Sequence, residues 1–561
     1  MTKLLKGGKV VNVFTGTVEK ENILIEDGKI IGVGDYCEAD IIDDVSGKYI
    51  CPGFIDGHIH VESTMMTPVE FAKAALLHGT TAAVADPHEI TNVCAAAGIK
   101  YMLEASKNLP VSIYFMLPSC VPGTIFDESG AVLNAEDLKP FYKEPRVLGL
   151  AEVMSYSQVI SNDSKIMEKI ADAKKLGKII DGHAPLLSGH DLDKYIAAGI
   201  SSDHECSSFE EAKERIKKGQ WVMIRQGTAA KNLEGLIDLF DEPWKERCLL
   251  VTDDRHAADF INEGHIDSII RRAAELGKSP VTGIQMATIN AAEYFGLKET
   301  GAVAPGYRAD LAVLNSLEEI DVCDVYIKGE KIVSNKIINN IKTPDIDTAL
   351  FKTVTNSFHL SKLKPEDFYI SPKGKKCRVI KTIKKQLFTD EWITDIDFDK
   401  NNGIDTERDI LKIAVIERHL GTGHKTLGFI SGIGLKKGAI ASSVSHDSHN
   451  IVVIGTNDID MACAVNQIIE MGGGYTVSES GNIKADLALP IAGLMADRPA
   501  EEIAKKNLFL LKAVHDLGAL EDIEPLMSMS FLSLAVIPSL KITTKGLIDV
   551  NSQTVVPLFV D

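Results

Sequence analysis

Short apolar segments alternate with helix-like segments over residues 49–251, and this alternation restricts the fold more than any other feature of the chain. Helical segments such as Thr67–His78 and Asp163–Leu176 each end before a glycine. Eight segments read as buried strands: Tyr49–Ile55, Thr80–Ala85, Val111–Leu117, Val147–Ala151, Lys178–Asp181, Gly199–Ser202, Trp221–Ile224 and Cys248–Val251. Eight βα units over about 250 residues predict an α/β fold, a (β/α)8 TIM-like barrel. A doubly wound open sheet is the alternative.

Two similar hairpin patterns lie outside this region. Residues 21–34 form two apolar-rich runs around Asp27-Gly28, a turn signal. Residues 324–333 repeat the pattern around Gly329-Glu330. We therefore expect one small β-sandwich domain built from both flanks, residues 1–50 and 300–345, with the barrel, residues 51–299, inserted between them.

Residues 346–561 predict a third, mixed α/β domain. Their strand-like segments are Lys412–Arg418, Gly438–Val444 and Asn450–Gly455. Helices are expected at Thr456–Glu470 and Leu508–Leu517, each followed closely by glycine.

Charge and cysteine content exclude several classes of function. The net charge is −19 without clustered Lys or Arg, which argues against binding of nucleic acid or an anionic membrane. No run of 18 apolar residues and no signal peptide is found. Nine cysteines without a CxxC pair indicate free thiols in a reducing cytoplasm. A neutral or cationic small substrate fits this chain best.

Metal-ligand residue types follow the predicted strands, where a barrel places its chemistry. His58 and His60 are two residues apart, so they share one face of a strand. Alone this pair is a weak signal. The other strand ends carry Asp86-Pro-His88-Glu89, Ser119-Cys120, Glu152, His183, Asp203-His204-Glu205, Arg225-Gln226 and Asp253-Asp254-Arg255. Scattered polar strand caps would rarely give histidines and carboxylates in this order.

The motifs resemble those of the amidohydrolase superfamily and, more closely, the bacterial adenine deaminases. The resemblance runs essentially from end to end. It is carried by Pro52-Gly-Phe-Ile-Asp-Gly-His-Ile-His-Val-Glu-Ser63, Asp86-Pro-His-Glu89, Ser155-Tyr, Asp181-Gly-His-Ala-Pro185, Asp203-His-Glu205, Thr252-Asp-Asp254, Pro305-Gly-Tyr-Arg-Ala-Asp-Leu-Ala-Val313 and Ser443-Val-Ser-His-Asp-Ser-His-Asn450.

The resemblance implies a centre for two divalent metal ions. His58, His60 and Asp253 would hold one ion, and His183 and His204 the other. Glu152 would bridge them, because the segment Leu150-Ala-Glu-Val-Met154 lacks the lysine that many relatives carboxylate. Histidine and carboxylate ligands without thiolate suit Mn or Fe, with Zn as a third choice.

The implied reaction converts adenine to hypoxanthine and ammonia, a step of purine salvage. Asp253 would take the proton of a metal-activated water and pass it to the leaving amine. N1 of the purine needs an acid, and Glu62 or Glu89 could supply it, with Glu62 slightly favoured. A cytoplasmic homo-oligomer, such as a dimer, is expected.

Five further residues are candidates for substrate binding. Asp86 and His88 either cap the next helix or line the site. His446, Asp447 and His449 either form a polar turn or reach over the barrel mouth to close the purine pocket. A Ser-His-Asp triad within 443–450 is excluded, because neighbours on an extended chain face opposite ways.

Two other functions stay open at this point. One is another binuclear amidohydrolase acting on a cyclic amide or related heterocycle. The other is a non-catalytic scaffold on the same fold, against which the intact ligand set argues. A zinc deaminase of the cytidine type is excluded, because His60-Val-Glu62 has no P-C-x-x-C partner.

Overall fold

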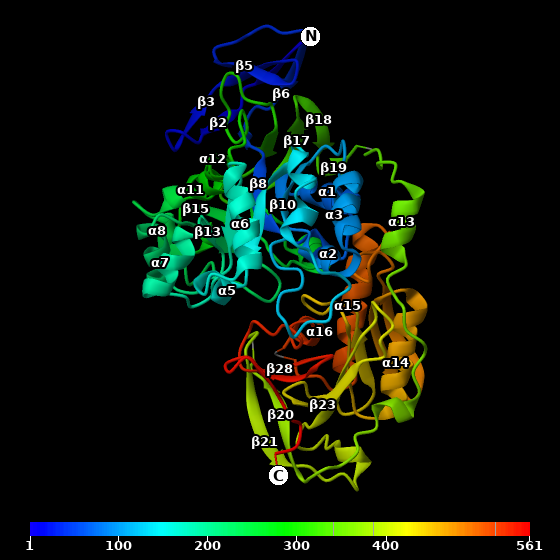
Figure 1. Cartoon of the computed structure of the whole chain (residues 1–561). Helices are drawn as coiled ribbons and strands as arrows, with labels where there is room; N and C mark the ends of the chain where they lie inside the picture. The colour runs from blue at the N-terminus through cyan, green and yellow to red at the C-terminus, as the bar shows by residue number, and fades with distance from the viewer. Residues whose placement is uncertain (340, 385, 522, 561) are drawn as a thin grey trace.

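A closed parallel barrel forms the centre of the computed structural model, which describes residues 1–339, 341–384, 386–521 and 523–560 (Figure 1). Its strands are β8 (Phe54–Ile59), β9 (Thr80–Ala85), β10 (Ser112–Leu117), β11 (Val147–Val153), β12 (Ile179–Gly182), β13 (Ser202–Asp203), β14 (Trp221–Arg225) and β15 (Cys248–Val251). Strands β8–β12 and β13–β15 form two parallel ladders. Hydrogen bonds from Ser201 N to Ile180 O and from Asp253 N to His58 O, both 2.9 Å, join the ladders at their seams. The (β/α)8 prediction is therefore confirmed.

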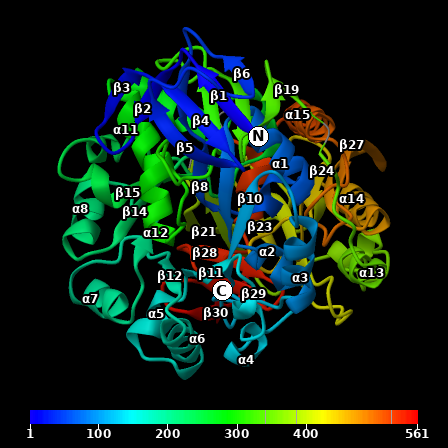
Figure 2. The same cartoon turned by 90° about the horizontal axis from the view of Figure 1, so that it is seen from above.

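Helices surround these strands, as Figure 2 shows for α3 and α6–α8. The two barrel helices bounded from sequence begin where expected: the Thr67 side chain caps α1, and Asp163 caps α6. The helices are α1 (Pro68–Leu77), α2 (His88–Cys94), α3 (Ala96–Ala105), α4 (Ala135–Leu138), α5 (Tyr156–Ile160), α6 (Ser164–Lys175), α7 (Gly189–Ala197), α8 (Phe209–Lys217), α9 (Ala257–Asn262), α10 (Ile266–Glu275), α11 (Pro280–Gln285) and α12 (Ala291–Phe295).

The first predicted strand is two strands in the structure. β7 (Tyr49–Pro52) pairs with β16 (Leu311–Leu314) in a flanking sheet, and only β8 belongs to the barrel. The break lies at Gly53, where a Cβ atom would come within 2.2 Å of the Thr81 side chain. Glycine thus lets the chain pass close to β9 as it crosses from one sheet to the other.

Both flanks of the barrel contribute to two packed sheets. One has the order β5-β4-β1-β6 and the other β19-β18-β17-β16-β7-β2-β3. Leu5 and Ile23 of the first sheet share a buried cluster with Val10, Ile50 and Val313 of the second. The remaining strands are β1 (Thr2–Lys6), β2 (Lys9–Asn12), β3 (Thr17–Lys20), β4 (Asn22–Glu26), β5 (Lys29–Gly34), β6 (Ile41–Asp44), β17 (Val322–Ile327), β18 (Glu330–Ser334) and β19 (Ile337–Ile338).

The rest of the chain builds an eight-stranded sheet of order β21-β20-β23-β22-β25-β24-β26-β27 and a small sheet β28–β30. The expected helix Leu508–Leu517 is only the second half of α15 (Ala500–Asp516), whose first turns bury Ala500, Ile503 and Ala504 between charged residues. The elements are α13 (Thr348–Thr355), β20 (Lys376–Thr382), β21 (Thr389–Asp395), β22 (Leu411–Ile416), β23 (Lys425–Ser431), β24 (Ala439–Ser442), β25 (Ile451–Gly455), α14 (Asp458–Met471), β26 (Gly474–Glu479), β27 (Asn482–Ala488), α16 (Pro525–Ser530), β28 (Leu540–Thr543), β29 (Gly546–Asp549) and β30 (Thr554–Val556).

This C-terminal part covers the end of the barrel at which the strands finish, while the flanking sheets lie at the other end (Figure 1). Ala496 N donates to Met65 O at 2.9 Å, and Lys545 Nζ donates to Ile125 O at 2.8 Å. Met65, Met66 and Ala496 belong to one buried cluster that runs through both parts. Among the described residues, no helix is long and apolar enough to cross a membrane. The residue bounds of the three domains stay a prediction.

Candidate metal centre

Strand β8 delivers the first pair of histidines to the covered end of the barrel. His58 lies in β8 and His60 directly after it, and their Nε2 atoms are 3.2 Å apart. The Oδ1 atom of Asp253, after β15, is 3.3 Å from Nε2 of His58 and 3.1 Å from Nε2 of His60. All three residues are buried. Two imidazoles and one carboxylate thus converge on one point.

Glu152, in β11, lies between this group and a second pair of histidines. Its Oε1 atom is 3.3 Å from Nε2 of His60. Its Oε2 atom is 2.7 Å from Nδ1 of His183 and 3.1 Å from Nε2 of His204. One buried carboxylate therefore contacts both histidine pairs, the position that a bridging ligand would occupy.

The donor set fits divalent metal ions. Nδ1 of His60 faces the backbone oxygen of Asp86 at 3.1 Å, which leaves the Nε2 lone pair directed at the centre. Three or four ligand atoms lie within 4.8 Å of one another in several overlapping groups of these residues. Imidazole and carboxylate without cysteine suit Mn, Fe or Zn.

Arg225 and Glu205, to which the sequence assigned no role beyond a place at strand ends, belong to this centre. Oε1 of Glu205 is 3.4 Å from Nε2 of His204 and 3.6 Å from Nδ1 of His183. Nη1 of Arg225 donates to Glu205 and, at 2.8 Å, to Oδ2 of Asp253. Burial disfavours a charged Glu205, but Arg225, His183 and His204 together outweigh burial and hold the pKa of Glu205 well below its usual range. The signal was their place after β13 and at the end of β14.

Asp86 and His88 lie at the beginning of α2 and also belong to the centre. Asp86 Oδ1 accepts from His88 N, and Asp86 Oδ2 contacts His88 Nδ1, both at 3.1 Å. Nδ1 of His88 is also 3.6 Å from Oε1 of Glu152. On the other side, Nε2 of His88 is 3.8 Å from Oδ1 of Asp447. His88 thus separates the histidine–carboxylate centre from the C-terminal part.

Glu62 lies in a local structure that strand geometry does not predict. Strand β8 ends at Ile59, and Glu62 lies in a short 3-10 helix, Val61–Thr64. Its Oε1 atom accepts from Ile90 N at 3.1 Å, while its Oε2 atom is buried and has no hydrogen-bond partner among the described residues. Burial raises the pKa of Glu62 to about 7. One carboxyl oxygen is therefore free for a ligand.

Glu89 is instead fully engaged by the C-terminal part. Nδ1 of His446 and Nε2 of His449 contact its two carboxylate oxygens. Ser445 N donates to Nδ1 of His449 at 3.1 Å, so the proton of that ring lies on Nε2. His449 therefore donates to Glu89, and the three side chains form a hydrogen-bonded cluster rather than a further metal site. The imidazole of His446 also stacks on Phe531, with centroids 4.5 Å apart.

The cluster predicts a pH dependence of stability. Burial disfavours the imidazolium, but the carboxylates of Glu89, Asp254 and Asp447 together outweigh burial and raise the pKa of His446 to about 9. The folded pKa lies above the unfolded value of about 6.5, so this contribution is fully present below about pH 6.5 and is lost as the pH rises through about 9. Calorimetry measures the melting temperature of the parent and of His446→Gln at about pH 7 and pH 10. Between these two pH values the melting temperature of the parent is expected to fall by about 2 °C or more beyond that of His446→Gln.

His449→Gln is the matched control, because burial lowers the pKa of His449 and keeps it neutral over this range. That variant is expected to retain the pH dependence of the parent. Equal pH dependence in the parent and in His446→Gln would contradict the assignment.

Sequence comparisons place the chain among known proteins. The model of the amidohydrolase family matches residues 49–346, and that of the adenine deaminase C-terminal domain matches residues 386–554. The chain is 44% identical to the adenine deaminase of Desulfatibacillum aliphaticivorans, over 99% of this chain and 97% of the relative. It is 46% identical to adenine deaminase 2 of Carboxydothermus hydrogenoformans, over 99% of this chain and 96% of the relative.

Among solved structures, dihydropyrimidinase from Brevibacillus agri is similar to part of the chain. It has a TM-score of 0.48 and 16% sequence identity, and the match covers 60% of this chain and 96% of that one.

Proposed function

Because the chain belongs to the adenine deaminase family of the amidohydrolases, we propose that it hydrolyses the C6 amine of adenine, giving hypoxanthine and ammonia. The observation that carries the proposal is Glu152, whose two carboxylate oxygens contact two separate pairs of histidines. This arrangement supports a pair of metal ions rather than one.

The six converging residues are the proposed metal ligands. His58, His60 and Asp253 would hold one ion, His183 and His204 the other, and Glu152 would bridge them. Bound there, two divalent ions would supply the Lewis acidity that lowers the pKa of a water molecule towards neutrality. Mn or Fe is proposed, with Zn as the alternative, because all three accept this donor set.

Asp253 is the proposed proton carrier. Its Oδ1 atom lies against His58 and His60, while its Oδ2 atom accepts from Arg225 at 2.8 Å. Arg225 thereby fixes the orientation of the carboxylate, so that Oδ1 stays directed at the reacting water. The carboxylate takes the proton of that water and delivers it to the departing amine.

The acid that contacts N1 of the purine is assigned to Glu62 rather than Glu89. Oε2 of Glu62 has no partner within the part of the chain that the structure describes. Both oxygens of Glu89 are occupied by His446 and His449. A group must have a free atom to donate to the substrate, so Glu89 serves to hold the C-terminal part over the barrel. His446 and His449 act through Glu89, and Asp86 acts by orienting His88.

Glu62→Gln is expected to lower kcat by about 10²- to 10⁴-fold, because the amide cannot transfer a proton to N1. Metal content and melting temperature should stay near those of the parent, since the bond from Ile90 N to the side-chain oxygen is retained. Steady-state kinetics with elemental analysis measures both.

Glu89→Gln is the comparison variant and is expected to lower the melting temperature, because it weakens the contacts with His446 and His449. A Glu62→Gln enzyme with parental kcat would overturn the assignment of the acid.

One preparation tests the function itself. Metal content and adenine-dependent ammonia release are measured together after growth in Mn or Fe, and ring opening of a hydantoin-type cyclic amide is assayed beside them. About two metal equivalents with ammonia release supports the proposal. Ring opening without ammonia release would favour a cyclic amidohydrolase. Well under one equivalent of metal would favour a non-catalytic scaffold.

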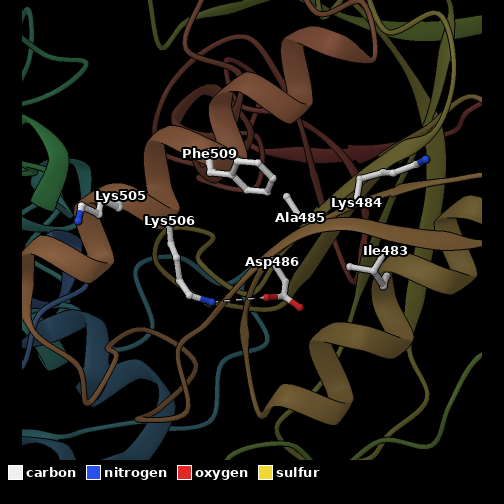
Figure 3. A pocket seen from close by; sticks show the side chains of 7 residues that line it. All are labelled: Ile483, Lys484, Ala485, Asp486, Lys505, Lys506 and Phe509. Atoms are coloured by element: carbon white, nitrogen blue, oxygen red, sulfur yellow. Dashed lines mark ion pairs between the residues drawn. The ribbon is translucent and has the colours of Figure 1, made fainter.

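We also propose a cytoplasmic homo-oligomer, with a dimer as the simplest form. Cys51, Cys120 and Cys248 are buried free thiols, as in a reducing compartment. A surface hollow of about 430 Å³ between β27 and α15 carries the exposed ring of Phe509 beside Lys505 and Lys506 (Figure 3). Leu508 is also exposed, and such apolar side chains suit a contact between copies. Light scattering of the purified chain measures the state.

A further inference from the structure

Two buried carboxylates approach each other where the segment after β10 meets the C-terminal part. Asp127 lies between β10 and α4, and Asp447 follows His446. Their side chains come from positions more than 300 residues apart and are 5% and 3% exposed. Gly123 lies between them: a Cβ atom there would be 3.0 Å from Oδ2 of Asp447 and 3.4 Å from Oδ2 of Asp127.

Each carboxylate has one buried oxygen without a partner. Oδ2 of Asp127 accepts from Thr124 N at 2.7 Å and from Thr124 Oγ1 at 2.9 Å. Oδ1 of Asp127 and Oδ2 of Asp447 have no hydrogen-bond partner among residues 1–339, 341–384, 386–521 and 523–560. Buried acceptors left unpaired are costly, so their presence points to a ligand with N–H groups.

The pair lies next to the proposed metal centre. Oδ1 of Asp447 is 3.8 Å from Nε2 of His88, and Nδ1 of the same ring is 3.6 Å from Oε1 of Glu152. One imidazole ring therefore separates the carboxylate pair from the bridging carboxylate. In a purine the five-membered ring is fused to the six-membered ring. If the six-membered ring lies at the metal centre, the five-membered ring lies about one ring width from the centre, as the carboxylate pair does.

We propose that Asp127 and Asp447 form a subsite for the imidazole edge of a free purine base, and that this subsite rejects bases substituted on N9. The inference rests on the proposed deamination of adenine. It extends that proposal by assigning the side chains that bind the half of the base remote from the amine.

The chemistry of the two partners is complementary. The five-membered ring of a free 6-aminopurine offers one N–H donor and one nitrogen acceptor. Burial, and next the charge of Asp447, raises the pKa of Asp127 to about 7, so near neutrality the pair can present a protonated carboxyl and a carboxylate. The carboxylate accepts from the ring N–H, and the carboxyl donates to the ring nitrogen. A substituent on N9 removes the donor and leaves a buried acceptor unpaired.

The test compares adenine with 9-methyladenine as substrates of Asp447→Asn. For adenine, kcat/KM is expected to fall by about 10- to 100-fold, mostly through KM, because the charge-assisted hydrogen bond from the ring N–H is lost. For 9-methyladenine, which lacks this N–H, kcat/KM should change little. The preference for adenine over 9-methyladenine therefore falls by the same factor, while metal content stays that of the parent.

Glu128→Gln is the control from the same segment, because Oε1 of Glu128 contacts Nδ1 of His424 at 2.9 Å and is not part of the pair. It should keep the parental preference. Asp127→Ala keeps the inference falsifiable if Asp447→Asn disturbs the adjacent His446. It should lower kcat/KM for adenine but not for 7-deazaadenine, which lacks the acceptor nitrogen.

Three outcomes overturn the subsite. Unchanged preference in Asp447→Asn with active enzyme removes it directly. Loss of one metal equivalent in either variant shows that the pair binds a cation instead. An equal fall for both substrates shows a structural effect. Failure of the proposed function looks different, because the parent itself would then release no ammonia from adenine.

Discussion

Glu152→Gln is expected to lose bound metal and turnover together, with kcat/KM for adenine reduced by about 10³-fold or more. The physical reason is the position of the carboxylate, which contacts His60 on one side and both His183 and His204 on the other. An amide carries no charge and offers a single acceptor oxygen, so it cannot bridge two cations in place of a carboxylate. Elemental analysis of the purified variant, beside ammonia release, measures both losses.

Glu70→Gln is a suitable control for the removal of a glutamate charge. Glu70 lies in α1, where its carboxylate accepts from Lys73 Nζ at 2.6 Å and from Ala500 N at 3.2 Å. That variant should keep its metal and its activity. A Glu152→Gln protein with full metal content and parental turnover would remove Glu152 from the bridging role.

Asp253→Asn is expected to retain the fold and much of the metal but to lower kcat by about 10²- to 10⁴-fold. Asp253 has a φ of +58°, a left-handed conformation that asparagine tolerates, so the backbone after β15 should be unchanged. The amide can still direct its oxygen at His58 and His60, but it cannot accept a proton from water. Melting temperature, metal content and kcat are measured on one preparation.

Asp254→Asn is the neighbouring control, because Asp254 Oδ1 accepts from Ser63 Oγ at 2.5 Å and has no assigned proton-transfer step. Its kcat should stay within about tenfold of the parent. Equal kcat in Asp253→Asn and the parent would show that another group carries the proton.

The barrel could be predicted because its signals are local. Most barrel strands are short apolar runs, and the two barrel helices that were bounded have their caps at Thr67 and Asp163. Once eight βα units are counted, the fold follows, and the fold brings every strand end to one rim. That is why His58, Glu152, His183, His204 and Asp253, spread over nearly 200 residues of chain, could be considered together before their distances were known.

The exact path of the chain at the first strand was not predictable. Tyr49–Ile55 reads as one apolar run, but the backbone passes from the flanking sheet to the barrel at Gly53. The reason is the close approach to Thr81, a residue about 30 positions away. Glu62 illustrates the same limit. Strand β8 ends at Ile59 and a 3-10 helix follows, so the alternation of side chains along a strand does not apply to Glu62.

Contacts between the barrel and the C-terminal part also could not be predicted from the sequence. Glu89 was a candidate acid until its two oxygens proved to be held by His446 and His449. The pairing of Asp127 with Asp447 and the bridge that Arg225 makes between Glu205 and Asp253 have no local signature. Such contacts depend on how two packed parts are oriented, and no short-range periodicity encodes that orientation.

The sequence by itself determined the strand–helix alternation, the order of the metal-ligand types and the family, because these depend on local spacing and on motifs. Only the tertiary structure decided which carboxylates are free and which are engaged. A carboxylate is available for chemistry only if its oxygens lack other partners, and those partners come from distant segments. Packing of the C-terminal part over the barrel therefore assigns Glu89 to holding the two parts together and leaves Glu62, Asp127 and Asp447 with an open oxygen each among the described residues.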